Sequence, residues 1–559
     1  MNQTTKKILK WVGVYALITL FLFFVFYLTL PAINIYSKGF WVFLAFALFL
    51  YILPQTGVFA ALADLKEYGA EKHVGRRMRP KLLLIALIPF LIMIIGGILS
   101  SSLFFARRYA SVITVEEAVF SEDMPETENV TNIALMDSST AAIVGSRTLG
   151  SLSDVISQFE LSGSYTQINY NGTPQKVANL EYAGFFKWLG NRDAGIPGYV
   201  MVDPVNNTAE YHALTETIRY AESGYFGDNL TRKLRFDYPT KIFGTPRFEV
   251  DEEGKPVYVV PCMKPKVFLF GAMDVVEVII FDPTTGDSTI YSVDETPSWI
   301  DIVYDGALAT EKYNWKGTLS GGFFNSVVGN KDCKRTTDDY GYIVIGDDVW
   351  YFTGVTSVNS DRSNIGFIIT NARTGEYNFY PVIGAEEHSA MSAAQGEVQE
   401  KGYVASFPAL INVRGEATYI MVLKDSGGLV KLYAMVNVEQ YNIVATGATQ
   451  EEAKAAYLEK LIAEGILTPE EPEEPPMDLT VTKVGTIDAI TTVVSGGESY
   501  IYLRITDAEG KTFLVKRRIA EDEALLFLSV GDIVTVKALP SETENVYTIV
   551  TLEKQNSEA

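Results

Sequence analysis

Three long apolar stretches at the amino terminus constrain this chain more than any other feature. They occupy residues 11–30, 40–62 and 82–105 of a 559-residue chain. Each is long enough to cross a hydrocarbon core of about 30 Å as a helix that rises about 1.5 Å per residue. A cleavable signal peptide is the alternative for the first stretch, but its apolar run is too long and no small-x-small cleavage site follows it. We therefore predict three transmembrane helices within residues 1–105.

The basic residues beside these stretches predict their orientation. Three lysines precede the first stretch, and six Lys or Arg residues lie in the 63–81 loop, whereas the loop at 31–39 contains only Lys38. Positive residues flank membrane helices on the cytoplasmic side. The amino terminus and the 63–81 loop are therefore expected in the cytoplasm, and residues 106–559 outside the cell membrane. Arg107 and Arg108 oppose this assignment but are outnumbered.

The charge of the chain is divided between these two parts. Residues 1–105 contain 10 Lys or Arg and 3 Asp or Glu, while the whole chain has 46 and 68, for a net charge of −22. An acidic body argues against nucleic acid as a ligand, because phosphate binding needs clustered cations. Two cysteines in the chain exclude a disulfide scaffold and a Cys-rich metal module. Cys262 and Cys333 could still form one disulfide outside the membrane, where thiols oxidise.

One turn sequence recurs three times between short β-type runs, at 202–211, 281–291 and 370–380. The first position of the turn is Asp or Asn, at residues Asp203, Asp282 and Asn371. Four residues later the turn has Asn or Gly, at Asn207, Gly286 and Gly375. A strand reversal needs Gly or Asn where φ becomes positive, and an Asx side chain can bond the backbone of the turn. A common hairpin explains one copy, whereas three copies with matching flanks favour duplication.

A larger unit surrounds two of these turns. Its elements come in the same order twice: a helix at 226–236 before strands at 247–250, 255–260 and 275–282, and a helix at 389–403 before strands at 407–413, 418–424 and 430–438. This order resembles the PepSY-like family of extracytoplasmic modules, whose final strand ends in Asp-x-x-Thr-Gly, here Asp282, Thr285 and Gly286. Asn371 departs from that ending. The resemblance implies a helix packed on a small antiparallel sheet, and a non-catalytic domain that inhibits or assists envelope peptidases.

The fold class expected from these patterns is α+β, with three transmembrane helices before a mainly antiparallel, β-rich ectodomain that contains duplicated helix-on-sheet units. A helix is also expected at 152–161. The predicted parts are a membrane-proximal segment at 106–198, a first PepSY-like unit at 199–300, a second at 301–447, a helix and acidic Pro-rich linker at 448–477, and a small β-barrel at 478–559. The five strands of the barrel are similar in order to an OB-fold. Protein or glycan contact is favoured there over oligonucleotide binding, because acidic residues offset its few cations.

Signals for catalysis are sparse. The chain has three histidines and no His-Glu-x-x-His or Cys-x-x-Cys sequence, so no metal or cofactor is expected. The Asp425-Ser-Gly-Gly428 segment could place Ser426 as a nucleophile with His212 or His388, but it lies between two β-type runs and is typical of a turn. Carboxylate pairs such as Asp347–Asp348, or Asp301 with Asp305, could serve a glycosidase or calcium. Solvated turns are the favoured explanation in so acidic a chain.

Two Gly-flanked aromatic segments are candidates for partner contact. The residues concerned are Phe185, Phe186, Trp188, Phe323 and Phe324. Exposed aromatic residues anchor interfaces, although core packing under a loop would give the same pattern. The sequence as a whole predicts a non-enzymatic, membrane-anchored envelope protein that binds, scaffolds or modulates another envelope protein. An envelope hydrolase and an accessory subunit of a transporter are the alternatives, and the oligomeric state is not predicted.

Overall fold

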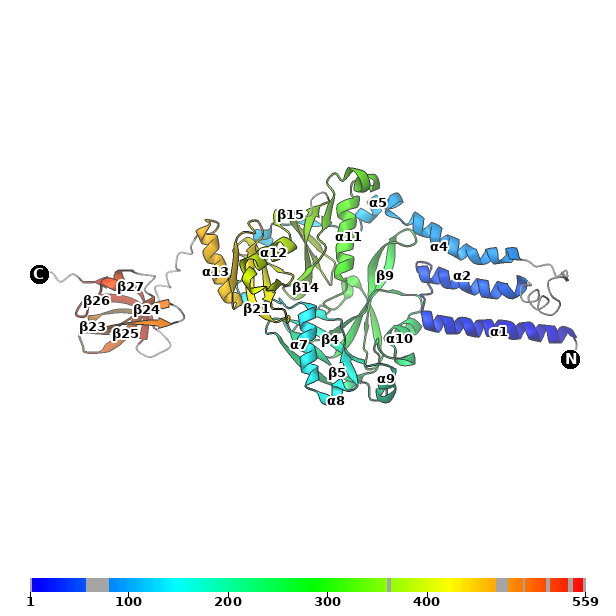
Figure 1. Ribbon diagram of the computed structural model, residues 1–559, viewed down its shortest axis with the longest axis horizontal. Helices are drawn as coiled ribbons and strands as arrows, with labels where there is room; N and C mark the ends of the chain where they lie inside the picture. The colour runs from blue at the N-terminus through cyan, green and yellow to red at the C-terminus, as the bar shows by residue number, and fades with distance from the viewer. Residues whose placement is uncertain are drawn as a thin grey trace. The chain divides into compact units, whose positions relative to one another are not determined.

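A computed structural model describes residues 3–56, 80–358, 363–468, 481–495, 498–518, 523–540 and 546–555 (Figure 1). The chain divides into two compact parts, residues 1–464 and 465–559, which are treated separately below. Two predicted features lie outside the described residues: most of the basic 63–81 loop, and the acidic Pro-rich linker beyond Thr468.

Three apolar helical segments open the chain, as the sequence predicts. They are α1 (Gln3–Thr29), α2 (Lys38–Ile52) continued by η1 (Leu53–Thr56), and η2 (Pro80–Leu87) continued by α4 (Ile88–Leu99). Each contains a stretch of 19 to 22 residues that is long and apolar enough to cross a membrane. The third helix ends earlier than predicted, and α5 (Ser102–Ala110) follows it as a separate helix. The chain is therefore membrane-associated through its amino-terminal helices.

A serine explains why the third apolar helix stops where it does. The Ser100 hydroxyl donates to the carbonyl of Gly96, and the same oxygen accepts the backbone N–H groups of Leu269 and Phe270 at 3.2 and 2.9 Å. The tip of a distant hairpin is thus bonded to the end of α4. This contact fixes the turn between α4 and α5.

The rest of the first part is built from four modules with the same order of elements. Module 1 contains α7 (Ser138–Gly150), α8 (Ser153–Ile156), β2 (Phe159–Leu161), β3 (Thr166–Tyr170), β4 (Thr173–Tyr182), α9 (Phe185–Asn191), β5 (Ile196–Asp203) and β6 (Thr208–Ile218). Module 2 contains η4 (Phe226–Asp228), α10 (Leu230–Asp237), β7 (Ile242–Phe243), β8 (Arg247–Val250), β9 (Pro256–Val267), β10 (Gly271–Phe281), β11 (Ser288–Ser292) and η5 (Val293–Glu295).

Modules 3 and 4 repeat this order. Module 3 contains α11 (Gly306–Leu319), η6 (Asn325–Gly329), β12 (Lys334–Thr336), β13 (Gly341–Ile345), β14 (Asp348–Ser357), β15 (Ser363–Asn371) and β16 (Tyr377–Tyr380). Module 4 contains α12 (Glu387–Glu397), η7 (Gln399–Lys401), β18 (Val404–Ala405), β19 (Ala409–Val413), β20 (Glu416–Lys424), β21 (Val430–Asn437) and β22 (Val444–Gly447). The remaining elements are β1 (Glu116–Glu117), α6 (Phe120–Asp123), η3 (Val130–Asn132), β17 (Gly384–Ala385) and α13 (Gln450–Ala463).

The strand pairing is identical in all four modules. The first and second strands both pair with the third, the third pairs with the fourth, and the fourth pairs with the fifth, always antiparallel. The sequence predicted two such units, at 199–300 and 301–447, and the sheets divide the chain differently. The turn at 203–207 joins the fourth and fifth strands of module 1, so the strands on either side of it complete that module rather than opening the next one.

The recurring turn has the same geometry in modules 1, 2 and 3. One side-chain oxygen of Asp203, Asp282 or Asn371 accepts the backbone N–H groups of the residues two and three positions later, at 2.8–3.3 Å. The later position has positive φ each time, 55° at Asn207, 84° at Gly286 and 73° at Gly375. The turn therefore needs an oxygen acceptor at its start and a residue tolerant of left-handed backbone near its end.

In modules 2 and 3, the chain that enters the module is hydrogen-bonded to the turn of that same module. The N–H groups of Arg219 and Tyr220 both donate to the carbonyl of Pro283, and those of Val303 and Tyr304 both donate to the carbonyl of Ala372, at 2.8–3.0 Å. The helices α7, α10, α11 and α12 of the four modules each begin at a capping side chain, which is Asp137, Asn229, Asp305 or Glu386 respectively. Such caps satisfy N–H groups that the helix leaves without partners. The helix predicted at 152–161 is confirmed only in its first half, because α8 covers Ser153–Ile156 and β2 begins at Phe159.

Two hydrophobic cores hold the modules in pairs. Modules 1 and 2 share one core, in which Trp188 and Leu230 pack with Phe281, and modules 3 and 4 share another, in which Phe352 and Phe367 pack with Tyr419. In module 4, α12 contributes Ala390 and Ala394 to this core. On the other face of this sheet, the hydroxyl of Tyr457 in α13 bonds to Thr418 of β20. The next residue, Tyr419, points into the shared core. Because successive residues of a strand point to opposite faces, the sheet is covered on both faces.

The second part of the chain is a closed five-stranded barrel. Its elements are β23 (Val481–Ser495), β24 (Glu498–Thr506), β25 (Thr512–Arg518), η10 (Glu523–Phe527), β26 (Ile533–Pro540) and β27 (Val546–Lys554). The strand order is β23-β24-β25-β27-β26, and the β25–β27 pair is parallel. Leu503, Val515 and Val534 are fully buried at its centre. The observed fold is α+β, with apolar amino-terminal helices, a mainly antiparallel body and a small terminal barrel, as predicted.

Candidate functional site

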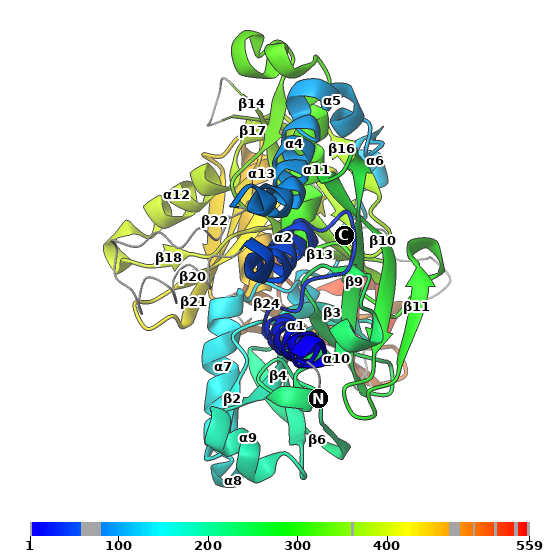
Figure 2. The ribbon, with the colours of Figure 1, turned by 90° about the vertical axis from the view of Figure 1, so that its right-hand side faces the viewer.

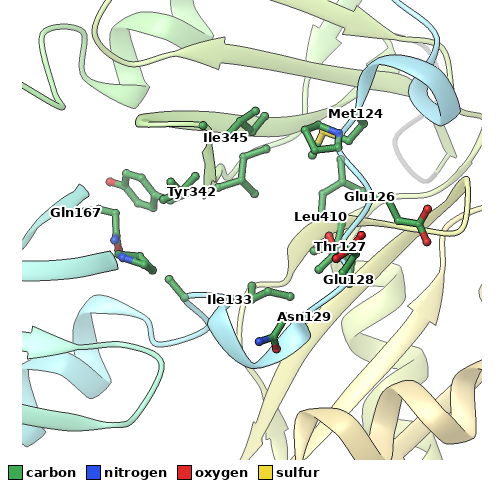
Figure 3. A pocket seen from close by; sticks show the side chains of 17 residues that line it. Met124, Glu126, Thr127, Glu128, Asn129, Ile133, Gln167, Tyr342, Ile345 and Leu410 are labelled. Carbon is green, nitrogen blue, oxygen red and sulfur yellow. The ribbon is translucent and has the colours of Figure 1, made fainter. Parts of the chain in front are cut away.

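One cavity of the body lies where modules 1, 3 and 4 meet. It has a volume of about 320 Å³, near the lower limit for ligand sites, and Figure 3 shows its walls. Its lining comes from the 124–134 segment, from β3 and the start of β4, from β13 and from β19: Met124, Pro125, Glu126, Thr127, Glu128, Asn129, Ile133, Ala134, Gln167, Pro174, Tyr342, Ile343, Val344, Ile345, Gly346, Leu410 and Ile411.

The cavity runs along the edge of β13 rather than over a face of its sheet. Five consecutive residues, Tyr342–Gly346, line it, whereas the face of a sheet would contribute only every second residue. Within the described residues, β13 pairs with β14 alone. One long side of this strand therefore faces the cavity without a neighbouring strand.

The register shows which backbone groups of β13 face the cavity. Ile345 pairs with Asp348 across a two-residue turn, so these two residues exchange hydrogen bonds, and the alternation of an antiparallel pair makes Val344–Val349 a non-bonded pair. The Val349 carbonyl indeed accepts from Ala372 on the far side of β14. The N–H and C=O groups of Tyr342 and Val344 accordingly point away from β14, toward the open edge.

The opposite wall of the cavity is an extended segment locked onto β19. Asn412 and Glu126 form a parallel β-bridge, and the carbonyl of Asn412 accepts the N–H of Thr127 at 2.8 Å. The buried Asn412 side chain donates to the carbonyl of Met124 at 2.7 Å, and Lys454 donates to the carbonyls of Thr127 and Glu128. We call residues 124–128 the covering segment, because it covers the outer edge of β19.

The chemistry of the cavity is apolar at its centre and acidic at one wall. Ile133, Ile345 and Leu410 contribute hydrocarbon surface, and the charged lining residues are the exposed Glu126 and Glu128 (Figure 3). At the other end, the Lys176 ammonium lies 5.2 Å from the centre of the Tyr342 ring, behind the wall. Burial lowers the pKa of Lys176 to about 8. The cavity therefore offers backbone groups, apolar surface and negative charge to a ligand.

The aromatic residues predicted as partner contacts are not part of this cavity. Trp188 is only 1% exposed and donates to the carboxylate of Asp228, so it is a core residue and cannot contact a partner. Phe186 and Phe324 are 82% and 75% exposed, on modules 1 and 3. Phe185 makes an edge-to-face contact with Tyr225, and Phe323 packs on the cluster that α5 forms with the end of α11.

The two cysteines are free and lie apart in the fold. Cys262 is in β9, within the core that modules 1 and 2 share, while Cys333 precedes β12 beside Asn325. The disulfide considered from the sequence is absent from the structure. Burial raises the pKa of the Cys262 thiol to about 12, and burial also raises the pKa of Cys333. Neither thiol is set up as a nucleophile, because reactivity needs a lowered pKa.

A group of buried carboxylates lies at the junction of modules 1, 2 and 3. Glu249 accepts the N–H groups of Asp301 and Ile302 at 3.0 Å each, and Asp301 accepts the N–H of Asn169 at 2.9 Å. Burial raises the pKa of Asp301 to about 7 and that of Glu249 well above its usual value. The pocket beside them holds only about 40 Å³, too little for a sugar ring. These carboxylates bond the backbone of the module link and do not form a substrate cleft.

The remaining catalytic candidates are also separated. Ser426 lies in the exposed turn between β20 and β21, where Asp425 accepts the N–H groups of Gly427 and Leu429. His388 packs on Phe407, and His212 stacks on Tyr199 in module 1. Asp305 caps α11, and Asp348 pairs with Arg373 at 2.8 Å, so both have structural roles. Across the described part of the chain, no group of three or more His, Cys, Asp or Glu side chains could hold a metal ion.

Comparisons with known proteins identify no relative. No family model and no curated protein matches the chain. Similarity to solved structures is weak. Yeast Stn1 and Ten1 match with 15% sequence identity over 14% of this chain and 43% of that one, at a TM-score of 0.13. Two proteins of Bacteroides ovatus also match: a xyloglucan-locus GH43B protein with 9% identity over 71% of this chain and 78% of that one (TM-score 0.18), and a glycosyl hydrolase with 10% identity over 63% of this chain and 82% of that one (TM-score 0.16). The first match thus spans less than half of that yeast chain. TM-scores this low carry no argument about fold or activity.

Proposed function

We propose that this chain is a non-enzymatic, membrane-anchored envelope protein that binds an extended segment of another envelope protein along the open edge of β13. The open edge carries the proposal, because a strand with one side unpaired binds extended polypeptide through main-chain hydrogen bonds. The cavity beside it supplies apolar surface for the ligand's side chains. Glu126 and Glu128 favour a ligand that carries Lys or Arg near its apolar residues.

The location of the binding site is part of the same proposal. The excess of Lys and Arg beside the first and third apolar helices supports a cytoplasmic amino terminus, which puts the four modules and the barrel outside the cell membrane. The helix-before-sheet order of each module supports kinship with PepSY-like domains, and the five-stranded closed barrel supports an OB-like domain. Binding modules of these kinds inhibit, assist or scaffold other proteins.

Hydrolysis is the rival that the buried carboxylates raise. Against it, Glu249 and Asp301 bond backbone N–H groups, and the space beside them is close to the size of a few water molecules. The large cavity, conversely, has its carboxylates exposed on one wall and no second acid facing them among its lining residues. A retaining or inverting glycosidase needs two opposed carboxyl groups about 5–10 Å apart. A binding role fits both places better.

Site-directed photocrosslinking in the native membrane tests the proposal. A benzoylphenylalanine at Glu126, on the wall of the cavity, is expected to crosslink the full chain to a specific envelope protein through an extended segment of it. The matched control carries the same probe at Glu400, which is also exposed but lies in η7, away from the cavity. Equal labelling from both positions would contradict a binding site along β13. Turnover of a wall polymer by the purified chain, lost in Asp301→Asn, would favour the hydrolase instead.

A further inference from the structure

The membrane helices and module 2 are joined by specific contacts at the end of α1. Arg235 donates to the carbonyl of Leu30, just beyond that helix, at 3.0 Å, and Ile33 donates through its N–H to the carbonyl of Pro239 at 2.7 Å. A cation at a helix carboxyl terminus satisfies its orphan carbonyls and opposes its dipole. Arg235 is only 6% exposed, and burial lowers its pKa to about 10. Module 2 is therefore held against the membrane helices.

A second arginine brings an exposed phenylalanine to the same level. Arg232 donates to the carbonyl of Phe226 at 2.7 Å and to that of Tyr27 at 3.4 Å, and its guanidinium lies 4.2 Å from the centre of the Tyr27 ring. Tyr27 is in the last turn of α1. Because one side chain spans both carbonyls, Phe226 lies beside the end of a helix long enough to span the bilayer. Figure 2 shows α10 next to α1 in the view from the side of the amino-terminal helices.

The tip of the β9–β10 hairpin meets the third membrane helix in a similar way. Leu269 and Phe270 donate to the Ser100 hydroxyl, and a Cβ on Gly96 would lie 2.8 Å from Leu269, so hairpin and helix are in direct contact. Phe268, the residue before this contact, is 51% exposed and stacks on Phe105 of α5. A second exposed aromatic side chain thus lies where a membrane helix ends.

Four phenylalanines share this side of the molecule, and we call them the basal face: Phe186 (82% exposed), Phe226 (57%), Phe236 (46%) and Phe268 (51%). Phe236 contacts the rings of Phe26 and Tyr27 in α1. Phe186 is connected to Phe226 through the rings of Phe185 and Trp188. Contacts of these rings and of Arg232 thus run from module 1 to the end of α1, and Phe268 adds an aromatic side chain near the end of α4.

Two further features set the basal face apart from the rest of the chain. Phe226 and Phe268 have φ of 50° and 48°, a left-handed backbone that bulky residues rarely adopt. Such strain persists where function maintains it. In addition, segments 185–195, 223–241 and 262–270 contain eight Lys or Arg and three Asp or Glu, whereas the chain as a whole is strongly acidic. Four of these cations, Arg192, Lys233, Lys241 and Lys266, pair with Asp193, Asp237, Glu277 and Asp274, and the others remain to attract anionic headgroups. Exposed phenylalanines among cations are typical of a surface that meets lipid headgroups.

We propose that the basal face rests on the bilayer in which the chain is anchored, with Phe186 and Phe226 inserted among the headgroups and the basic residues attracting anionic lipid. The occupant is the membrane itself, because the arginine and serine contacts place this face at the ends of helices that span it. The phenylalanines at 185 and 186, predicted to contact a protein partner, are thereby assigned to lipid. This inference is independent of the peptide site along β13.

Depth-dependent quenching in vesicles tests the inference. The full chain is reconstituted into vesicles of phosphatidylcholine and phosphatidylglycerol, with an environment-sensitive fluorophore attached at Phe186→Cys or Phe226→Cys; the native thiols are buried. Replacing the acyl chains by brominated ones is expected to remove more than half of the emission, because an interfacial side chain lies within about 5–10 Å of the acyl boundary. The matched control is Ile383→Cys, which is 74% exposed and precedes module 4.

The comparison between sites decides the outcome. Strong quenching at 186 and 226, with unchanged emission at 383, would support contact of the basal face with lipid. Quenching at 186 and 226 no greater than at 383 would overturn the inference, and so would aqueous iodide quenching all three sites equally. No other protein is present in these vesicles, so a protein partner cannot mimic the positive result.

Discussion

The second strands of modules 3 and 4 are equivalent in topology but opposite in what lies against them. β19 of module 4 has its outer edge covered by the covering segment, through the Glu126–Asn412 bridge and the bond from Thr127 to Asn412. β13 of module 3 has no strand on its outer edge within the described residues and faces the cavity instead. The chain has thus closed one of two equivalent edges with its own backbone.

This contrast indicates what the open edge can bind. Exposed edges invite pairing with other chains, and proteins protect them unless pairing is useful. The covered edge shows that a short extended segment from a distant part of the chain fits a strand of this type. The open edge keeps the same geometry in a neighbouring module, with apolar side chains lining the space beside it. The predictions below test the closed edge, the bond that joins the two modules, and then the open edge.

The largest local effect, on the hydrogen exchange of one backbone amide, is expected from Asn412→Ala. The variant leaves the carbonyl of Met124 and the N–H of Gly415 without their partners in a buried site, at a cost of about 3 kcal/mol. Because the covering segment then detaches more easily, the amide of Thr127 should exchange its hydrogen much faster. Hydrogen exchange of the full chain in detergent measures this. Asn378→Ala is the control, since that side chain bonds only the exposed Glu376; equal exchange at Thr127 in both variants would contradict the assignment.

A second prediction concerns the bond between modules 3 and 4. Glu387 of α12 is fully buried and accepts the N–H of Gly354 in β14 at 2.6 Å. Burial raises its pKa from 4.5 to about 7. Below pH 4.5 both folded and unfolded states hold this proton, and between pH 4.5 and 7 only the folded state does. Stability should therefore fall as pH rises through this window, by about 1.4 kcal/mol per pH unit, and level off above pH 7.

Glu387→Gln should remove that part of the pH dependence, because glutamine keeps an oxygen for Gly354 and cannot ionise. Thermal unfolding of the full chain at pH 4.5, 6 and 7.5 compares the variant with the parent. Asp301 and Glu249 are present in both proteins, so the difference between the two stability–pH profiles isolates the contribution of Glu387. Glu400→Gln, on the exposed turn after α12, serves as the control. A parallel pH profile for parent and Glu387→Gln would show that this proton does not hold the two modules together.

The sequence predicted those parts of the fold that have a local signal. Long uncharged stretches identified the three apolar helices, and the Asx–Gly turn identified a duplicated element whose hydrogen bonds the structure contains three times. The number of modules was missed because the helix of module 1 is rich in Ser, Thr, Ala and Gly and lacks an apolar stripe. The insertion of α9 between β4 and β5 further obscured the strand order of that module.

The candidate site could not be predicted in the same way. The open edge of β13 depends on which strands pair with it, and that is decided elsewhere in the chain. The covering segment was predicted only as part of the membrane-proximal segment at 106–198. Its bond to Asn412 joins residues 288 positions apart. Phe185 and Phe186 were predicted as partner contacts together with Trp188, but Phe186 is exposed and Trp188 is buried, so neighbours in sequence can have opposite environments.

The smallest effect, and the most specific, is expected at the open edge itself. Val344 directs its N–H toward the cavity and away from β14, so Val344→Pro removes a hydrogen bond to a bound segment without removing one from the sheet. The melting temperature should change little, whereas crosslinking from Glu126 to the partner should weaken about tenfold, as expected for one lost backbone bond of about 1.4 kcal/mol. Val430→Pro is the matched control, at the start of β21 and outside the cavity. If Val344→Pro crosslinks as well as the parent while Asn412→Ala releases the covering segment, then the two equivalent edges have different chemistry, and the open edge of β13 is not where the partner binds.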